Sequence, residues 1–226
     1  VETWAEKGAA QAVSRVAAAA HQLLVELQLQ PSDLCAIGIA SPGPLDTARG
    51  CVDGSPNLPG WTGYPIEGEL SKSFGGLPAR IDNDCNAAAL GEYLFGAGKG
   101  KKNVIYITIS TGIGGGAVID GRLMPGSNGN AAEIGHIPLT MDGPRCGCGN
   151  LGCWEAYASG TAIARRTREA LSAGRASSIT GFAGSIEQVT THHLFQALTQ
   201  KDPLAIEIWD ESIDYLGRGL GAVINT

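Results

Sequence analysis

The 226-residue sequence has few charged and few aromatic residues, 17% and 6% of the chain, and its net charge is −6. Its apolar runs stay well short of the roughly 20 residues that a transmembrane helix needs. The first residues lack the basic segment, apolar core and cleavage site of a signal peptide, and no repeat of solenoid period is visible. The acidic balance gives no attraction to nucleic acid or to an anionic membrane. These features predict a cytoplasmic protein that binds neither.

Apolar residues and glycines, by contrast, are plentiful: 43% of the chain is hydrophobic, and it contains 33 glycines. The glycines gather around 38–63, 96–100, 112–116 and 143–152, which is typical of turns and ligand-facing loops. The length is enough for one large domain or two modest ones. Six cysteines could form three disulfides, but their surroundings favour reduced thiols, with Cys35 and Cys85 as ordinary packed residues.

Three of the cysteines stand close together in a glycine-rich stretch of ten residues, 146–155. Thiolates at this spacing can converge on one ion, and tetrahedral zinc takes a fourth ligand such as histidine. We therefore predict a zinc site built from His136, Cys146, Cys148 and Cys153. Glu133 and Glu155 lie beside its two ends, which suggests that the metal ties down a loop that builds a substrate pocket.

Hydrophobic periodicity and proline positions predict helices over 3–29, 154–158, 161–173, 191–198 and 203–225. Strands are predicted over 34–40, 78–82, 103–109 and 117–119, with a hairpin turn at Asp120-Gly121. The segment 175–188 is predicted to be a loop. A basic turn at 99–102 separates two halves of the chain.

Polar residues collect where the strand 78–82 ends and the next helix begins, in Asn83-Asp84-x-Asn86. Open α/β sheets place their ligand-binding groups at such strand ends. Either Asp84 or Asn86 could instead cap the helix, but two candidates for one capping position leave the other for chemistry. The proline-rich loop 55–61 carries Asn57, whose amide could contact a substrate or lie in a plain surface loop.

The strand 103–109 is followed by Ser110-Thr111-Gly112-Ile113-Gly114-Gly115-Gly116, which we interpret as a glycine-rich turn between two strands. Main-chain N–H groups in such a turn can approach a phosphate closely. No Gly-Lys-Ser/Thr closes the turn and no helix follows it, which excludes the Walker and dinucleotide-binding patterns. A strand–turn–strand phosphate loop points to the actin-like ATPase architecture.

Several of these motifs occur in one order over residues 35–155, and in that order the chain resembles the ROK family of repressors and sugar kinases, in particular its bacterial glucokinase branch. The motifs are Ser-Pro-Gly-Pro at 41–44, Asn57 to Trp61, Asn83-Asp84-x-Asn86, Thr111 to Gly116, Glu133-x-Gly-His136, and Cys146-x-Cys148-Gly-x-x-Gly-Cys153-x-Glu155.

The resemblance implies an actin-like ATPase (ribonuclease H-like) α/β fold of two domains, with a sugar cleft between them and a zinc-binding loop at 136–153. We expect a small α/β domain over 1–100 and a large one over 101–226. A homodimer is expected by family analogy.

The resemblance also implies ATP-dependent phosphorylation of a hexose, glucose first, with Mg²⁺ accompanying ATP and the zinc ion structural. Asp84 would be the general base. Sugar hydroxyls would be bound by Asn83, Asp84, Glu133, His136 and Glu155, with Asn57 a weaker candidate. The ATP phosphates would be cradled by the segment 111–115, with Thr111, Gly112, Gly114 and Gly115 as the binding residues.

The chain departs from the family pattern at both ends. An opening strand with an Asp-x-Gly-Gly-Thr motif is not found before the first helix, and a strand and glycine pair near the adenosine are not found after the last one. On this basis we expect the chain to be truncated at both termini. We expect no glucose phosphorylation by the 226-residue chain alone, an expectation that measurable turnover with MgATP would refute.

Other activities remain open at this stage. Mannose, N-acetylglucosamine and N-acetylmannosamine are alternative substrates, because pocket shape around one substituent decides among them, and polyphosphate is an alternative donor. A ROK-type sugar-responsive repressor without its DNA-binding segment is the main rival, although Asp84 and the intact glycine-rich turn favour a kinase. A zinc-stabilised binding module would explain the cysteines but neither of those two features.

Overall fold

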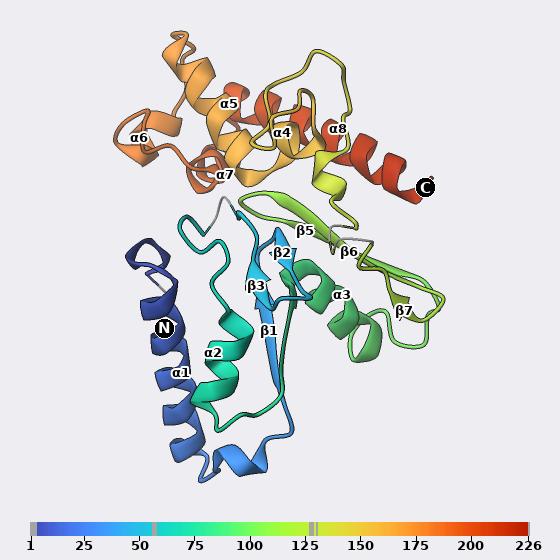
Figure 1. Ribbon diagram of the computed structural model, residues 1–226. Helices are drawn as coiled ribbons and strands as arrows, with labels where there is room; N and C mark the ends of the chain where they lie inside the picture. The colour runs from blue at the N-terminus through green and yellow to red at the C-terminus, as the bar shows by residue number, and fades with distance from the viewer. Residues whose placement is uncertain (1–3, 56–57, 127–128, 130, 226) are drawn as a thin grey trace. The chain divides into compact units, whose positions relative to one another are not determined.

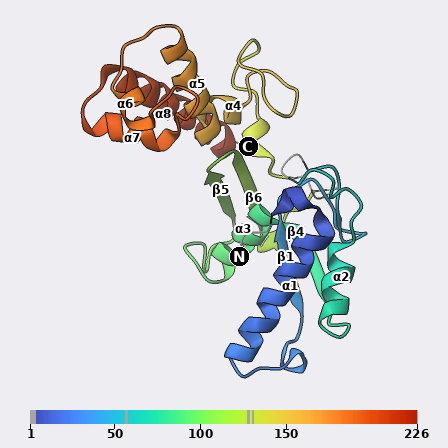
Figure 2. The same cartoon turned by 90° about the vertical axis from the view of Figure 1, so that its left-hand side faces the viewer.

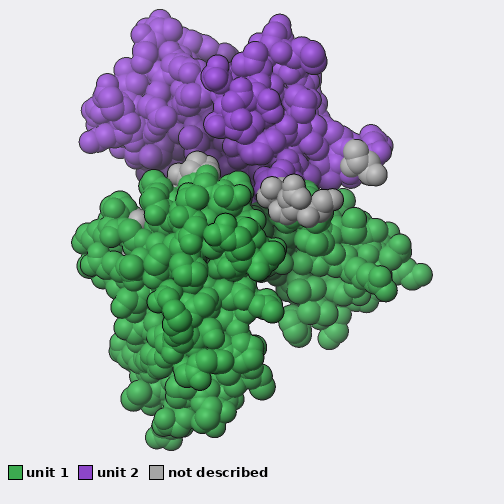
Figure 3. Space-filling view, viewed as in Figure 1, with its two compact units in different colours: residues 1–106, 116–132 green, residues 107–115, 133–226 purple. Residues whose placement is uncertain are grey.

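The computed structural model describes residues 4–55, 58–126, 129 and 131–225. The chain forms two compact units, one of residues 1–106 and 116–132 and the other of residues 107–115 and 133–226 (Figure 3). We call them unit 1 and unit 2. The predicted division into domains 1–100 and 101–226 stays a prediction; residues 116–132 pack with unit 1.

Unit 1 begins with helices. A 3₁₀ turn, η1 (Ala5–Lys7), precedes α1 (Ala9–Glu26), and a second turn, η2 (Pro31–Asp33), follows it. Alanine-rich composition favours α1, and Gly8 supplies the positive φ of 95° at which the chain enters it. The helix predicted over 3–29 is therefore confirmed in its middle, whereas its first turn is separate.

Two parallel strands form the centre of unit 1. β1 (Ile37–Ser41) pairs with β4 (Ala79–Asn83), so that Ser41 lies opposite Asn83. A small antiparallel pair, β2 (Leu45–Asp46) and β3 (Cys51–Val52), stands in the connection between them. Because parallel strands run in the same direction, the polar ends of β1 and β4 meet at one edge of the sheet.

Helices cover this sheet. α2 (Ile66–Ser73) lies between α1 and the strands (Figures 1 and 2). α3 (Asp84–Leu94) also contacts β1 and β4. Apolar side chains of α1, α2 and the strands form one core that includes Val13, Trp61 and Ile81. Cys85 and Cys51 are buried, whereas Cys35 is exposed, so the interpretation of Cys35 as a packed residue is wrong.

A three-stranded sheet has the order β5 (Val104–Ile109), β6 (Ile113–Ile119) and β7 (Arg122–Leu123). The hairpin turn at Asp120-Gly121 is confirmed, with φ values of 48° and 77°. The glycine-rich segment differs from the prediction, because only 110–112 form a turn and the glycines at 114–116 lie within β6. Gly116 packs against α3 so tightly that a Cβ would collide with the carbonyl oxygen of Cys85.

Unit 2 is mainly helical. It contains η3 (Ile134–His136), α4 (Trp154–Ala158), α5 (Gly160–Ser172), α6 (Ile179–Ala183), α7 (Thr191–Thr199) and α8 (Pro203–Ile224). Apolar side chains of α5 to α8 share a core around Ile179, Leu194 and Leu204. The helices predicted over 154–158, 161–173, 191–198 and 203–225 are confirmed within one or two residues, while α6 lies in the segment predicted to be a loop.

Side-chain caps explain where the longer helices begin. Ser159 Oγ accepts a hydrogen bond from Ala162 N–H (3.1 Å) at α5, and Asp202 Oδ1 accepts one from Ala205 N–H (3.0 Å) at α8, where Pro203 takes the first helical position. Thr190 is the N-cap of α7. None of the helices in the described ranges is long and apolar enough to cross a membrane.

Candidate active site and metal centre

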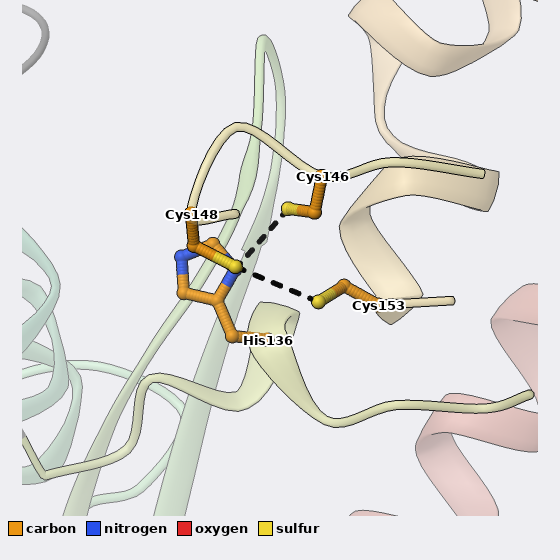
Figure 4. A group of neighbouring side chains, drawn as sticks. All are labelled: His136, Cys146, Cys148 and Cys153. Atoms are coloured by element: carbon orange, nitrogen blue, oxygen red, sulfur yellow. Dashed lines mark hydrogen bonds between the residues drawn. The ribbon is translucent and has the colours of Figure 1, made fainter. Parts of the chain in front are cut away.

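The clearest constellation is in unit 2, where His136, Cys146, Cys148 and Cys153 point toward one another (Figure 4). One ligand atom from each of the four lies within 4.8 Å of the others. His136 Nδ1 is 3.6 Å from Cys146 Sγ, and Cys148 Sγ is 3.7 Å from Cys153 Sγ. The structure thus brings together the four side chains predicted as metal ligands.

These distances suit a tetrahedral zinc ion. With Zn–S bonds of about 2.3 Å, two sulfur ligands of a tetrahedral site stand about 3.8 Å apart. Three thiols and one imidazole are also a ligand set that structural zinc sites use. The ligand types and these two distances therefore fit a zinc ion.

The local fold explains why the ligands converge. Tight turns at Gly149 and Gly152, with φ of 96° and 69°, bend the chain between the cysteines. Cys146 N–H donates to Asn150 O (2.9 Å), and Trp154 N–H donates to Ile137 O (2.9 Å), which fixes the start of α4 beside η3. A side chain at Gly152 would collide with the carbonyl oxygen of Thr140. Glycine is thus required at this bend by both dihedral angle and space.

Burial controls the protonation of the thiols. Burial raises the pKa of Cys146. Burial together with hydrogen bonds to Cys148 and Cys146 raises the pKa of Cys153 to about 12. Burial opposes ionisation of Cys148 too, but hydrogen bonds from Asn150 N–H and from the other two thiols outweigh it and lower the pKa of Cys148. To hold a metal ion as thiolates, at least Cys146 and Cys153 would therefore have to lose their protons.

Both predicted carboxylates of unit 2 flank this cluster. Glu133 Oε2 lies 4.0 Å from His136 Nε2, the ring nitrogen that does not face Cys146. Glu155, on the first turn of α4, accepts a hydrogen bond from Ile113 N–H at Oε2 (2.8 Å), and Cys146 Sγ lies 3.8 Å from its Oε1. This separation between Glu133 Oε2 and His136 Nε2 is longer than a hydrogen bond, so Glu133 stands near His136 without a hydrogen bond between these two atoms.

In unit 1 the candidate residues stand where β4 ends and α3 begins. Asn83 is the N-cap, because its Oδ1 accepts from Cys85 N–H (2.8 Å) and Asn86 N–H (3.3 Å). Asp84 is exposed, and its Oδ1 accepts from Cys85 N–H (2.9 Å). The alternative that Asp84 or Asn86 is the N-cap is therefore wrong, since Asp84 and Asn86 both lie within α3. The cap is chiefly Asn83.

Sequence reasoning missed the role of Asp82. Its Oδ1 accepts from Asn83 N–H (2.7 Å) and from Asn86 Nδ2 (2.9 Å). Asn86 is 1% exposed, so the amide that donates the second of these bonds is buried. The signal was three consecutive polar residues at a strand end, of which only the last two were interpreted. Asp82 and Asn86 brace the segment that presents Asp84.

The other predicted residues are placed as follows. Thr111 is exposed in the turn 110–112, Gly112 is in the same turn, and Gly114 and Gly115 are in β6. Asn57 lies outside the described residues. The sugar-binding candidates divide between the units: Asn83 and Asp84 belong to unit 1, and Glu133, His136 and Glu155 belong to unit 2.

Comparison with known proteins links this constellation to one family. The ROK family model matches residues 5–226. A glucokinase from Thermotoga maritima is 43% identical over 189 residues, which are 84% of this chain and 59% of that protein. A xylose repressor from Bacillus subtilis is 39% identical over 143 residues, 63% of this chain and 36% of that protein. The chain thus spans about three fifths of the length of the glucokinase.

Solved structures agree in fold. The ROK hexokinase of Thermus thermophilus superposes with a TM-score of 0.80 at 36% identity, covering 100% of this chain and 68% of that one. A ROK family glucokinase from Streptomyces griseus, solved in complex with glucose and AMPPNP, gives 0.79 at 37% identity, covering 96% and 68%. The predicted α/β, actin-like ATPase fold is thereby confirmed.

Proposed function

The chain belongs to the ROK family, and on that premise we propose that the protein phosphorylates a hexose, glucose first, with MgATP as the donor. One observation carries the proposal: Asn83 and the exposed Asp84 stand together at the end of β4 in a chain 43% identical to a glucokinase. Carboxylates at such strand ends are available to a ligand.

In the proposed reaction, Asp84 is the general base. A hydroxyl oxygen of the sugar forms a bond to the γ-phosphorus, the bond from that phosphorus to the bridging oxygen of ADP breaks, and the hydroxyl proton passes to the Asp84 carboxylate. Asp84 Oδ1 accepts from Cys85 N–H, and within the described residues no hydrogen bond to its Oδ2 is made. One oxygen is thus fixed by the main chain while the other can receive the proton.

The sugar hydroxyls are assigned to Asn83, Asp84, Glu133, His136 and Glu155, with Asn57 as a weaker candidate. Carboxylates and amides suit this task because both accept hydrogen bonds from hydroxyl groups. An amide can also donate a hydrogen bond to a hydroxyl oxygen. The positions of Glu133 and Glu155 beside the thiol cluster support the assignment. A metal bound by the cluster would fix the loop and, through it, the positions of both carboxylates.

The phosphates are assigned to the turn 110–112 and the following glycines, with Thr111, Gly112, Gly114 and Gly115 as the contacts. Mg²⁺, which accompanies ATP, supplies charge neutralisation on the phosphates. For the cluster in unit 2 we propose zinc in a structural role, because four protein ligands leave no position for a reacting water. A cytoplasmic homodimer acting in glycolysis completes the proposal, on family grounds.

The test is turnover of the protein as its gene encodes it. Asp84→Asn keeps the size and the hydrogen bond from Cys85 N–H but removes the base, so we expect turnover to fall by about 100-fold to 10,000-fold. Glucose affinity should fall much less than turnover, because the asparagine amide can still form a hydrogen bond to a sugar hydroxyl. The matched control is Asp120→Asn, an exposed aspartate in the β6–β7 turn, where φ is 48° and asparagine is equally tolerated.

Two further measurements refine the substrates. A panel of glucose, mannose, N-acetylglucosamine and N-acetylmannosamine tests the acceptor, and ATP against polyphosphate tests the donor. An Asp84→Asn variant that retains full turnover would remove Asp84 from the mechanism.

The similarity to the Bacillus subtilis xylose repressor supports a second candidate, a sugar-responsive repressor. The two differ in one simple observation. A repressor binds sugar and DNA without consuming ATP, whereas a kinase releases ADP in proportion to the sugar supplied. The Asn83–Asp84 pair and the glycine-rich turn favour the kinase.

A further inference from the structure

Ile113, the first residue of β6, is held on both sides of its peptide backbone. The residue is 3% exposed. Its N–H donates to Glu155 Oε2 at 2.8 Å, and its carbonyl oxygen lies so close to Gly135 that a Cβ there would collide with it. This residue directly follows the turn 110–112, so the orientation of the turn depends on both contacts.

The two residues that hold Ile113 are both neighbours of cluster ligands. Gly135 directly precedes His136 in η3, and Glu155 follows Cys153 by two residues on the first turn of α4. The two short helices are linked to each other, because Trp154 N–H donates to Ile137 O at 2.9 Å. A shift of either cluster ligand would therefore reach Ile113 through one or two residues of rigid backbone.

The turn itself has the same dependence on Glu155. A Cβ at Gly112 would collide with Glu155 Oε2, so the carboxylate lies directly against the turn backbone. On the other side, Ser110 O accepts from Gly160 N–H at 2.8 Å, at the first residue of α5. All of these residues belong to unit 2. The turn is thus fastened to the helix starts that follow the cysteine loop.

We propose that Glu155 is a positioning residue that couples the metal cluster to the phosphate-binding turn. With the metal in place, His136 and Cys153 would be fixed, and Gly135 and Glu155 would be fixed with them. Ile113 would then hold the N–H groups of Thr111 and Gly112 in the arrangement that receives phosphate. The metal then controls nucleotide affinity although none of its ligands has been assigned to the nucleotide. The nucleotide half of this statement rests on the proposed function.

This role differs from the sugar contact assigned to Glu155 above. Oε2 accepts from Ile113 N–H, a main-chain bond that does not involve a sugar hydroxyl. Replacement of Glu155 should therefore weaken binding of a nucleotide that carries no sugar acceptor, which a sugar contact alone would not do.

The experiment measures amide hydrogen exchange at Ile113 by NMR and AMPPNP affinity by calorimetry, without glucose. Glu155→Ala removes the acceptor, whereas Glu155→Gln keeps an oxygen that can accept from Ile113 N–H. Glu169→Ala, an exposed glutamate on α5 paired with Arg165, is the control. Wild-type protein with and without a zinc chelator forms the second arm, and zinc content is recorded for every sample.

We expect Ile113 exchange to accelerate and AMPPNP affinity to fall by about 10-fold to 100-fold in Glu155→Ala and after chelation. Glu155→Gln should restore most of both, and Glu169→Ala should change neither. Unchanged Ile113 exchange in Glu155→Ala and after chelation overturns the coupling, as does unchanged AMPPNP affinity when wild type binds AMPPNP. If wild type binds no AMPPNP, the phosphate role of the turn has failed, and Ile113 exchange still decides whether the cluster holds the turn.

Discussion

In unit 1, the side chains of Asn83 and Asp84 accept hydrogen bonds from main-chain N–H groups at the start of α3. The Asp82 carboxylate accepts from Asn83 N–H, and none of these contacts involves a proposed metal ligand. In unit 2, Glu133 and Glu155 stand on single turns of helix beside a loop whose four convergent side chains include three thiols. An ordinary strand–helix junction supports the proposed base. The proposed sugar contacts of unit 2 depend instead on short elements, which have little stability of their own.

The comparison teaches that the candidate residues of the two units should respond differently to destabilisation. A strand–helix junction is stabilised by the same hydrogen bonds as the fold around it, so it should persist as long as unit 1 is folded. The loop of residues 137–152 contains no helix or strand, and its main-chain pairing consists of isolated bridges at Pro138–Cys153 and Arg145–Leu151 and of single hydrogen bonds such as Cys146 N–H to Asn150 O. Such a loop needs a cross-link, which the metal would supply.

The largest effect should come from Cys153→Ser. Cys153 is fully buried, and a hydroxyl is a poor replacement for a zinc-binding thiolate. We expect metal content to fall from about one ion per chain to a small fraction of that, with faster amide exchange over 136–153. Exchange in α1 and α2 should stay as in wild type.

The control for this substitution is Cys35→Ser, which changes an exposed thiol in unit 1. If Cys153→Ser keeps its metal, or if α1 and α2 loosen as much as the loop, the contrast between the units is wrong.

A smaller effect is expected for Asn86→Ala, which attacks the junction in unit 1. The substitution removes the buried bond from Asn86 Nδ2 to Asp82 and should cost about 1–3 kcal/mol of free energy of unfolding. Turnover should fall by about 10-fold, because Asp82 also accepts from Asn83 N–H, and metal content should not change.

Asn103→Ala is the matched control for Asn86→Ala, since Asn103 is exposed and its Oδ1 accepts from Asp120 N–H in a surface turn. Urea unfolding and metal analysis make the measurement. Loss of metal in Asn86→Ala would show that the two regions are not independent.

The smallest effect concerns Asp202, which caps α8 in unit 2 at a distance from the cysteine loop in sequence. Burial opposes ionisation of this carboxyl, but hydrogen bonds from Ser178 and Ala205 N–H and from the Ser178 and Ser177 hydroxyls lower its pKa below the ordinary value of 3.8. A depressed pKa in the folded state contributes stability above pH 3.8 that is lost as the pH falls through the folded value.

We therefore expect Asp202→Ala to lower the free energy of unfolding by about 1–2 kcal/mol at pH 7 and by less near pH 3. Asp210→Ala, an exposed position on the same helix, should be close to neutral at both values. Urea unfolding at the two pH values makes the comparison. A deficit that is equal at pH 7 and pH 3 would contradict the role assigned to the charge.

Features set by local residue pattern could be predicted from the sequence. The four cluster ligands, the β4–α3 junction and the helices α5, α7 and α8 all follow from spacing, caps or periodicity, each of which acts over a few residues. Most element boundaries were wrong by one to three residues, because capping depends on which of several polar residues reaches the free N–H groups.

Features that depend on contacts distant in sequence could not be predicted. The glycines at 114–116 have the composition of a turn, yet they form part of β6, because Gly116 must lie against Cys85 of α3. The bond from Ile113 N–H to Glu155 joins residues 42 positions apart, and no local pattern indicates it. Asp82 was overlooked for a different reason, since its function is to hold its neighbours.

Gly219 of α8 gives the cluster an unexpected sensitivity. A Cβ at this position would enter the indole ring of Trp154, which is fully buried between Cys153 and Glu155 in sequence. A change at Gly219, on a helix that carries none of the proposed ligands, would push Trp154 and the residues on either side of it. In a genetic screen, replacement of Gly219 by a larger residue would therefore resemble a mutation in the proposed metal site or nucleotide site. Its position on α8 alone would not reveal that cause.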